Sequence, residues 1–118
     1  MKDLTNLNRP KIADKILSLD ELSDAVTMLQ QEGHTVVHCH GVFDLVHPGH
    51  IRHLEAAARL GDKLLVTLTA DEFVNKGPGR PAFNAQLRAE TLAALECVAL
   101  VGINDAPHAV DLITKLHP

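Results

Sequence analysis

The sequence predicts an α/β fold in which a parallel sheet is covered by helices. Apolar, β-branched runs alternate with amphipathic segments in the order βαβαβα, and a glycine-containing turn leads from the first strand directly into a helix. The 118 residues are enough for one domain with a core of its own. We expect residues 1–34 to form an N-terminal arm and helix, and residues 35–118 to form the main domain.

The first helix has clear signals at both ends. Residues 1–14 are polar and mixed, which predicts an arm or loop. Ser18 and Glu21 then have the spacing of a capping box, and the helix that they open is expected to run to about Gln31 and to stop at Gly33. Its core-facing side is expected to carry Leu22, Val26 and Leu29.

The next strand, turn, helix and strand follow without a break. Residues 35–40 predict the first strand, residues 41–48 a turn, and the residues after it a helix that ends at Leu60. A second strand is expected over residues 63–69. The core stripe of the helix is expected to be Ile51, Leu54, Ala57 and Ala58.

The last third of the chain begins with a basic loop. Residues 75–83 are rich in Gly and Pro and cannot form regular structure. Asn84 is a suitable cap for a helix to about Glu96, with a core stripe of Leu87, Leu92 and Leu95. The remaining expected elements are a third strand over Cys97–Val101 and a helix from Asp105 and Pro107 to about Leu116.

Composition and charge exclude several classes of protein. No apolar run approaches the roughly 20 residues that cross a bilayer, and the first residues do not resemble a signal peptide. Cys39 and Cys97 are therefore expected to be reduced core residues of a cytoplasmic protein. A net charge of −4 and the absence of Trp and Tyr argue against a nucleic-acid partner.

The segment Gly41-Val42-Phe43-Asp44-Leu45-Val46-His47-Pro48-Gly49-His50 is the most informative part of the chain. It connects a strand to a helix N-terminus, where the first N–H groups have no partner within the helix and the dipole favours an anion. His47 and His50 add two donors there, and Gly49 has no side chain to block the approach of a phosphate. The segment therefore predicts a phosphate site.

This segment, G-x-F-D-x-x-H-x-G-H after a strand, resembles the signature of the cytidylyltransferase-like nucleotidyltransferases. The similarity spans roughly residues 35–117 and is greatest to glycerol-3-phosphate cytidylyltransferases and to the adenylyltransferase domains of ADP-heptose synthases. Further matches follow in the family's order: Leu60-Gly61-Asp62, the strand at 64–69, Asp71-Glu72-Phe73, Lys76, Arg80-Pro81 and Arg88. The resemblance implies a Rossmann-like three-layer fold with residues 35–118 as the nucleotidyltransferase domain.

The resemblance also implies an activity, namely transfer of CMP or AMP from CTP or ATP to a sugar phosphate or polyol phosphate with release of pyrophosphate. It implies catalytic roles for His47, His50 and Lys76, and acceptor-phosphate contacts from Arg80 and Arg88. The nucleotide would contact Gly41, Val42, Phe43, Asp44, His47, Gly49, His50 and Lys76. Asp44 would hold the turn, and Mg²⁺ would be bound mainly through the nucleotide phosphates, with no metal ligands of the protein.

Two other interpretations stay open. Six of the eight histidines, at positions 34, 38, 40, 47, 50 and 53, lie close together in the sequence, which suggests zinc, but no Cys or carboxylate spacing completes a structural zinc site. The family also has a further strand and a Ser/Thr-rich segment after the last residue here, so the chain is expected to be truncated at its C-terminus. The alternative function is then a nucleotide-binding or regulatory module without turnover of its own. Fusion to a sugar kinase domain in the full-length protein, and a homodimer through the first strand, are separate expectations.

Overall fold

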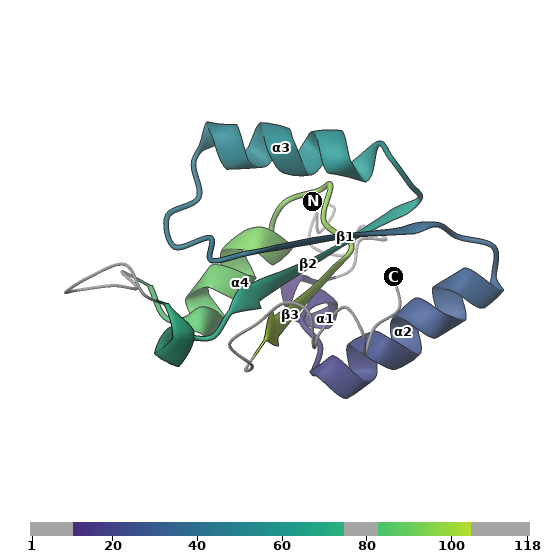
Figure 1. Ribbon diagram of the computed structural model, residues 1–118, viewed down its shortest axis with the longest axis horizontal. Coiled ribbons are helices and arrows are strands. Elements are labelled where there is room, and N and C mark those ends of the chain that lie inside the picture. The colour runs from purple at the N-terminus through teal and green to yellow at the C-terminus, as the bar shows by residue number, and fades with distance from the viewer. Residues whose placement is uncertain (1–10, 75–82, 105–118) are drawn as a thin grey trace, which may run out of the picture.

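A parallel sheet between two layers of helices forms the core of the molecule (Figure 1). The computed structural model describes residues 11–74 and 83–104. Within them, strands β1 (Val36–Gly41), β2 (Lys63–Thr69) and β3 (Leu100–Asn104) are all parallel and lie in the order β1-β2-β3. The helices are α1 (Ile12–Lys15), α2 (Leu19–Gln31), α3 (Pro48–Ala58), the 3₁₀ turn η2 (Asp71–Phe73) and α4 (Ala85–Ala93). The α/β fold with a parallel sheet is confirmed.

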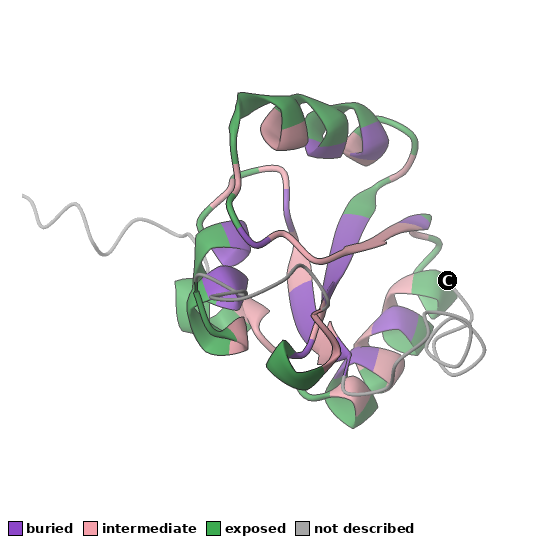
Figure 2. Ribbon diagram, turned by 60° about the vertical axis from the view of Figure 1, so that its left-hand side comes forward, coloured by how far each residue is buried: buried purple, intermediate pink, exposed green. Residues whose placement is uncertain are grey.

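The sheet buries both of its faces. Helices α3 and α4 pack on one face, around Leu54, Val66 and Leu92, and α2 packs on the other, around Leu22 and Leu65. Alternate residues of a strand point to opposite faces, so the central strand β2 has to be apolar on both sides. Its residues from 64 to 68 are all buried (Figure 2).

The start and stop of α2 agree with the sequence. The Ser18 hydroxyl accepts the Glu21 N–H at 3.2 Å, and the Glu21 carboxylate accepts the Ser18 N–H at 3.0 Å, which is the predicted capping box. Gly33 follows the helix with φ of +90°, a conformation that suits glycine. Both predicted boundaries are confirmed.

The predicted boundaries after α4 are wrong. The helix ends at Ala93 rather than near Glu96, and β3 begins at Leu100 rather than at Cys97. Val98 is apolar because it enters the core from the connection between the two elements, and its N–H bonds back to the carbonyl of Leu95. An apolar run of this kind cannot be distinguished from a strand by sequence alone. Cys97 therefore lies before the strand, half-buried and free.

The rotation of α4 about its axis is also not the predicted one. Leu87, expected in the core, is 46% exposed, whereas Arg88 is 1% exposed. The buried positions of the helix are Arg88, Ala89, Leu92 and Ala93. Asn84 caps the helix through the Leu87 N–H, and the turn so formed directs the Arg88 side chain inward.

Two expectations concern the ends of the chain. The predicted helix from Asp105 to about Leu116 and most of the predicted arm lie outside the described residues. The short helix α1 was not predicted, since its four residues are too few to give a periodic pattern. Among the helices that the structure describes, none has the length and apolar character needed to span a bilayer.

Candidate functional site

The turn from Gly41 to His47, named the signature turn here, lies where β1 ends and α3 begins. This places it at the carboxyl edge of the parallel sheet, where ligands bind in open α/β folds. Phe43 has φ of 51°, the one non-glycine residue with positive φ in the described chain. Strained backbone of this kind is concentrated at functional sites. The phosphate site that the sequence predicts at this turn stays a prediction, and the contacts of the turn show which donors it would have.

The two imidazoles of the motif cap the helix that follows the turn. His47 is the N-cap residue of α3, and its Nδ1 accepts the Gly49 N–H at 3.0 Å. His50 Nδ1 accepts the His47 N–H at 3.2 Å. The pair thus makes a capping box in which histidines replace the usual Ser and Glu. The two rings lie next to each other, with their centroids 4.0 Å apart and their planes tilted by 38°.

These contacts fix the tautomer of both rings. A backbone N–H can only donate, so the Nδ1 atoms of His47 and His50 have to be unprotonated acceptors. In a neutral imidazole the hydrogen then resides on Nε2. Each ring therefore uses one nitrogen to build the helix start and keeps an N–H on the other. The turn combines two such donors in a small space.

The same contacts modify the expectation about the helix N-terminus. We expected the first-turn N–H groups of the helix to be open to a phosphate, but Pro48 has none and the Gly49 N–H bonds to His47. The N–H of His50 bonds to the His47 carbonyl at 2.9 Å. These N–H donors are absent or already bonded within the turn, so an anion here would meet imidazole Nε2–H groups rather than the amides.

Gly49 is needed for the position of the His47 ring. A Cβ atom at residue 49 would lie 2.7 Å from His47 Cε1 and 3.0 Å from His47 Nδ1, distances too short for carbon. Phe43 contacts the other ring, that of His50, in a T-shaped arrangement with a centroid distance of 6.0 Å. The space that Gly49 leaves open is thus filled by an imidazole, and the approach of a phosphate to its backbone stays a prediction.

Asp44 lies under the signature turn, 7% exposed. One of its carboxylate oxygens accepts the Phe83 N–H at 3.4 Å, which connects the turn to the residue before the N-cap of α4. This matches the expectation that Asp44 holds the turn in place. With the side chain buried, the predicted role of Asp44 as a direct nucleotide contact stays a prediction.

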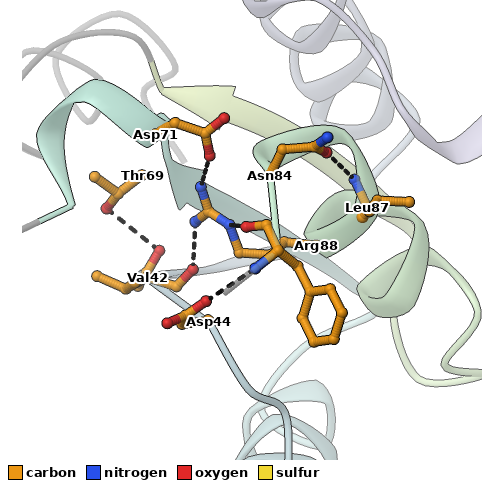
Figure 3. A network of polar contacts seen from close by, with 9 residues as sticks. Val42, Asp44, Thr69, Asp71, Asn84, Leu87 and Arg88 are labelled. Carbon is orange, nitrogen blue, oxygen red and sulfur yellow. Dashed lines mark hydrogen bonds and ion pairs between the residues drawn. The ribbon is translucent and has the colours of Figure 1, made fainter. Parts of the chain in front are cut away.

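Arg88, predicted to contact an acceptor phosphate, is instead bound within the protein (Figure 3). Its Nε donates to the Phe83 carbonyl at 3.0 Å, and one terminal nitrogen donates to the Val42 carbonyl at 2.8 Å. The other terminal nitrogen forms an ion pair with Asp71 at 2.7 Å. Sequence reasoning missed the role of Asp71, because residues 17 apart show no pattern that would pair them.

The other candidate residues are distributed as follows. Gly41 and Val42 are half-buried at the start of the turn, where the Gly41 carbonyl accepts from the Thr69 hydroxyl at 3.5 Å and the Val42 carbonyl accepts from Arg88. Lys76 and Arg80 lie outside the described residues, so their assignment stays a prediction.

The structure separates the histidines that suggested zinc. His38 and His40 lie on β1, where His38 Nε2 is 2.7 Å and His40 Nδ1 is 2.8 Å from the hydroxyl of Thr67. His47 and His50 cap α3 instead. Within residues 11–74 and 83–104, no group of three or more His, Cys, Asp or Glu side chains has an arrangement that would hold a metal ion.

The two histidines on β1, His38 and His40, predict that the fold loses stability in acid. Burial, with a smaller effect of neighbouring His40, lowers the pKa of His38 from 6.5 to about 4. Burial also lowers the pKa of His40. The unfolded chain therefore binds protons below pH 6.5 while folded His38 stays neutral until about pH 4, so we expect the free energy of unfolding to decrease as the pH falls through this window.

Denaturant unfolding of the protein and of a His38→Gln variant between pH 7 and pH 4.5 measures this effect. The variant is expected to show the smaller decrease over this range, and the exposed-site control His53→Gln is expected to behave as the parent does. Equal decreases in all three proteins would contradict the assignment.

Comparison with known proteins adds to this geometry. The model of a family described as cytidylyltransferase-like matches residues 38–118. Among curated relatives, the bifunctional protein HldE of Methylobacillus flagellatus is 43% identical over 108 residues, which cover 90% of this chain and 22% of the relative. The bifunctional protein HldE of Syntrophotalea carbinolica is 41% identical over 106 residues, covering 88% of this chain and 22% of the relative.

A solved structure matches as well. The lipopolysaccharide core biosynthesis protein from Thermoplasma volcanium superposes with a TM-score of 0.67 at 27% identity, covering 73% of this chain and 70% of that one. The chain thus spans about a fifth of the length of the curated relatives it matches, 22% in the two described above.

Proposed function

The chain belongs to the cytidylyltransferase-like family of nucleotidyltransferases, and we propose that it transfers CMP or AMP from CTP or ATP to a phosphorylated sugar or polyol. The observation that carries the proposal is the pair of imidazoles at the signature turn. Both use Nδ1 for the helix start and so hold a hydrogen on Nε2, at an exposed helix N-terminus that favours anions.

The proposed reaction needs no covalent intermediate with the protein. A phosphate oxygen of the acceptor attacks the α-phosphorus of the triphosphate, a new P–O bond forms, and the bond from the α-phosphorus to the bridging oxygen breaks. Pyrophosphate leaves with that oxygen and its electron pair. Negative charge shifts toward the equatorial and leaving oxygens, so donors that tighten on them in the transition state accelerate the step. We assign this role to His47 and His50.

Cations complete the proposed site. Lys76 would contact the triphosphate and Arg80 the acceptor phosphate, as the sequence predicts. We propose that Mg²⁺ arrives with the triphosphate, because phosphate oxygens are the ligands it prefers and the described side chains provide no cluster of three for it. Bound there, the ion would neutralise part of the phosphate charge.

The relatives favour a sugar phosphate as the acceptor. The matching solved structure is a lipopolysaccharide core biosynthesis protein, and such cores are built from sugars. The HldE relatives are called bifunctional, and this chain matches 22% of their length. We therefore propose that the present domain supplies the nucleotidyl-transfer half of a pair of activities, with a sugar kinase as the proposed other half.

A screen of pyrophosphate release tests the proposal. The protein is incubated with Mg²⁺ and either CTP or ATP, and with a panel of phosphorylated sugars and polyols. We expect release that requires one nucleotide and one class of acceptor. Isothermal titration with both nucleotides runs beside it, since binding of a triphosphate without release for any acceptor would favour the alternative, a nucleotide-binding or regulatory module.

A further inference from the structure

The guanidinium of Arg88 is a buried charge at the base of the signature turn. Its side chain is 1% exposed and has hydrogen bonds to the Phe83 carbonyl, the Val42 carbonyl and the Asp71 carboxylate (Figure 3). Burial of a charge is unfavourable unless the charge is paired and hydrogen-bonded. Each of the three nitrogens has such a partner, so the group is already satisfied before any ligand arrives.

Asp71 makes Arg88 a poor site for a phosphate. The Asp71 side chain is 47% exposed, so it is the half of the ion pair that solvent and ligands reach. A phosphate would have to displace this carboxylate or approach a second negative charge, and like charges at short range repel. The geometry therefore argues against contact between Arg88 and an acceptor phosphate.

The bond from Arg88 to Val42 acts on the strained part of the turn. The Val42 carbonyl belongs to the peptide group just before Phe43, which has the left-handed φ of 51°. Rotation of Phe43 toward an ordinary φ would reorient that peptide, so the bond to Arg88 opposes it. The Phe43 ring in turn contacts His50. A continuous set of contacts thus leads from Arg88 to a proposed catalytic imidazole.

A second contact sets the position of the turn relative to α4. Phe83 donates its N–H to Asp44 in the turn and accepts from Arg88 through its carbonyl. The turn, η2 and the start of α4 are therefore joined through one side chain, since Asp71 belongs to η2. A planar guanidinium with several fixed donors can do this, whereas an ammonium group cannot reproduce the geometry.

We propose that Arg88, held by Asp71, is a positioning residue that fixes the signature turn and through it the His50 imidazole. This proposal rests on the proposed function, because that function gives the turn a nucleotide to bind. It replaces the expectation that Arg88 contacts the acceptor, and it adds Asp71 to the residues on which the reaction depends.

Two variants distinguish positioning from phosphate binding. Arg88→Lys keeps the positive charge but loses the planar guanidinium with its fixed donors. It is expected to lower kcat by about 10²-fold, the effect of a misplaced group. The KM for the acceptor is expected to stay within about twofold of the parent value. Asp71→Asn is also expected to lower kcat. If Arg88 were a phosphate ligand, Asp71→Asn would instead free it and lower the KM for the acceptor, which would overturn the proposal.

The turn itself provides a readout that is independent of activity. Amide NMR signals of residues 41–44 and the imidazole signals of His50 are expected to shift in both variants, and to stay in place in the exposed control Arg52→Lys. Unchanged signals in Asp71→Asn, which alters an exposed carboxylate and is expected to fold, would overturn the proposal even if Arg88→Lys fails to fold. Absence of pyrophosphate release by the parent protein would count against the proposed function alone, since these signals report on the turn without substrate.

Discussion

Replacement of either motif histidine is expected to lower kcat by about 10²-fold or more, the usual effect of losing a donor aimed at the transition state. The variants are His47→Ala and His50→Ala. Each removes an Nε2–H donor from the signature turn, and each also removes half of the capping box of α3. The loss of the cap alone is expected to cost about 1 kcal/mol of stability. Steady-state rates of pyrophosphate release measure the first effect, and thermal unfolding measures the second.

Conservative variants separate the two roles of these side chains. Asn is a good N-cap residue, and Gln is the usual partner at the third helical position, so His47→Asn and His50→Gln are expected to restore much of the stability. Asn is too short to put a donor where imidazole Nε2 lies, so His47→Asn is expected to remain slow. Gln can place an amide nitrogen near that position, so His50→Gln is expected to recover part of its rate. Full recovery of turnover in His47→Asn, or unchanged turnover in the alanine variants, would show that the histidines act only as caps.

The variant Gly49→Ala is expected to have the next largest effect. The new Cβ would lie 2.7 Å from His47 Cε1, so the imidazole has to move away from the position in which it caps α3. A shift of about 1 Å at a catalytic group costs on the order of 10²-fold in rate. We expect kcat to fall by this order and the affinity for the triphosphate to fall with it. Pyrophosphate release and isothermal titration measure the two quantities.

A second glycine variant provides the control. Gly33→Ala introduces a Cβ at a residue with φ of +90° and so destabilises the end of α2, far along the chain from the turn. It is expected to lower the melting temperature and to leave triphosphate affinity unchanged below that temperature. Equal affinity of Gly49→Ala and the parent protein would contradict the assigned role of Gly49.

The sequence predicted those parts of the fold that depend on local signals. The capping box at Ser18, the stop at Gly33 and the strand at residues 63–69 were all correct, because each is set by residues close together in the chain. The turn was located by its motif and by the change from strand to helix around it. Its place at the carboxyl edge of the sheet then followed from the parallel topology.

Features that depend on distant contacts could not be predicted. Arg88 was expected to contact an acceptor phosphate and Leu87 to lie in the core, whereas Arg88 is buried with bonds to the Val42 carbonyl and Asp71, and Leu87 is exposed. Nothing in the sequence around residue 88 indicates these partners. The shared hydroxyl of Thr67 between His38 and His40 is likewise a contact between strands, and it follows only once the register of β1 and β2 is known.

The central claim is that the signature turn binds a triphosphate through Nε2–H groups of His47 and His50. Long-range ¹H–¹⁵N NMR spectra of the histidine rings, recorded with and without CTP or ATP and Mg²⁺, test it most directly. We expect both rings of the free protein to be protonated at Nε2 and unprotonated at Nδ1, as their contacts with the backbone require. One of the two nucleotides is expected to shift both Nε2 signals and to leave those of His38 and His40 in place. Protonation at Nδ1, or unchanged signals of His47 and His50 at saturating amounts of both nucleotides, would contradict the account.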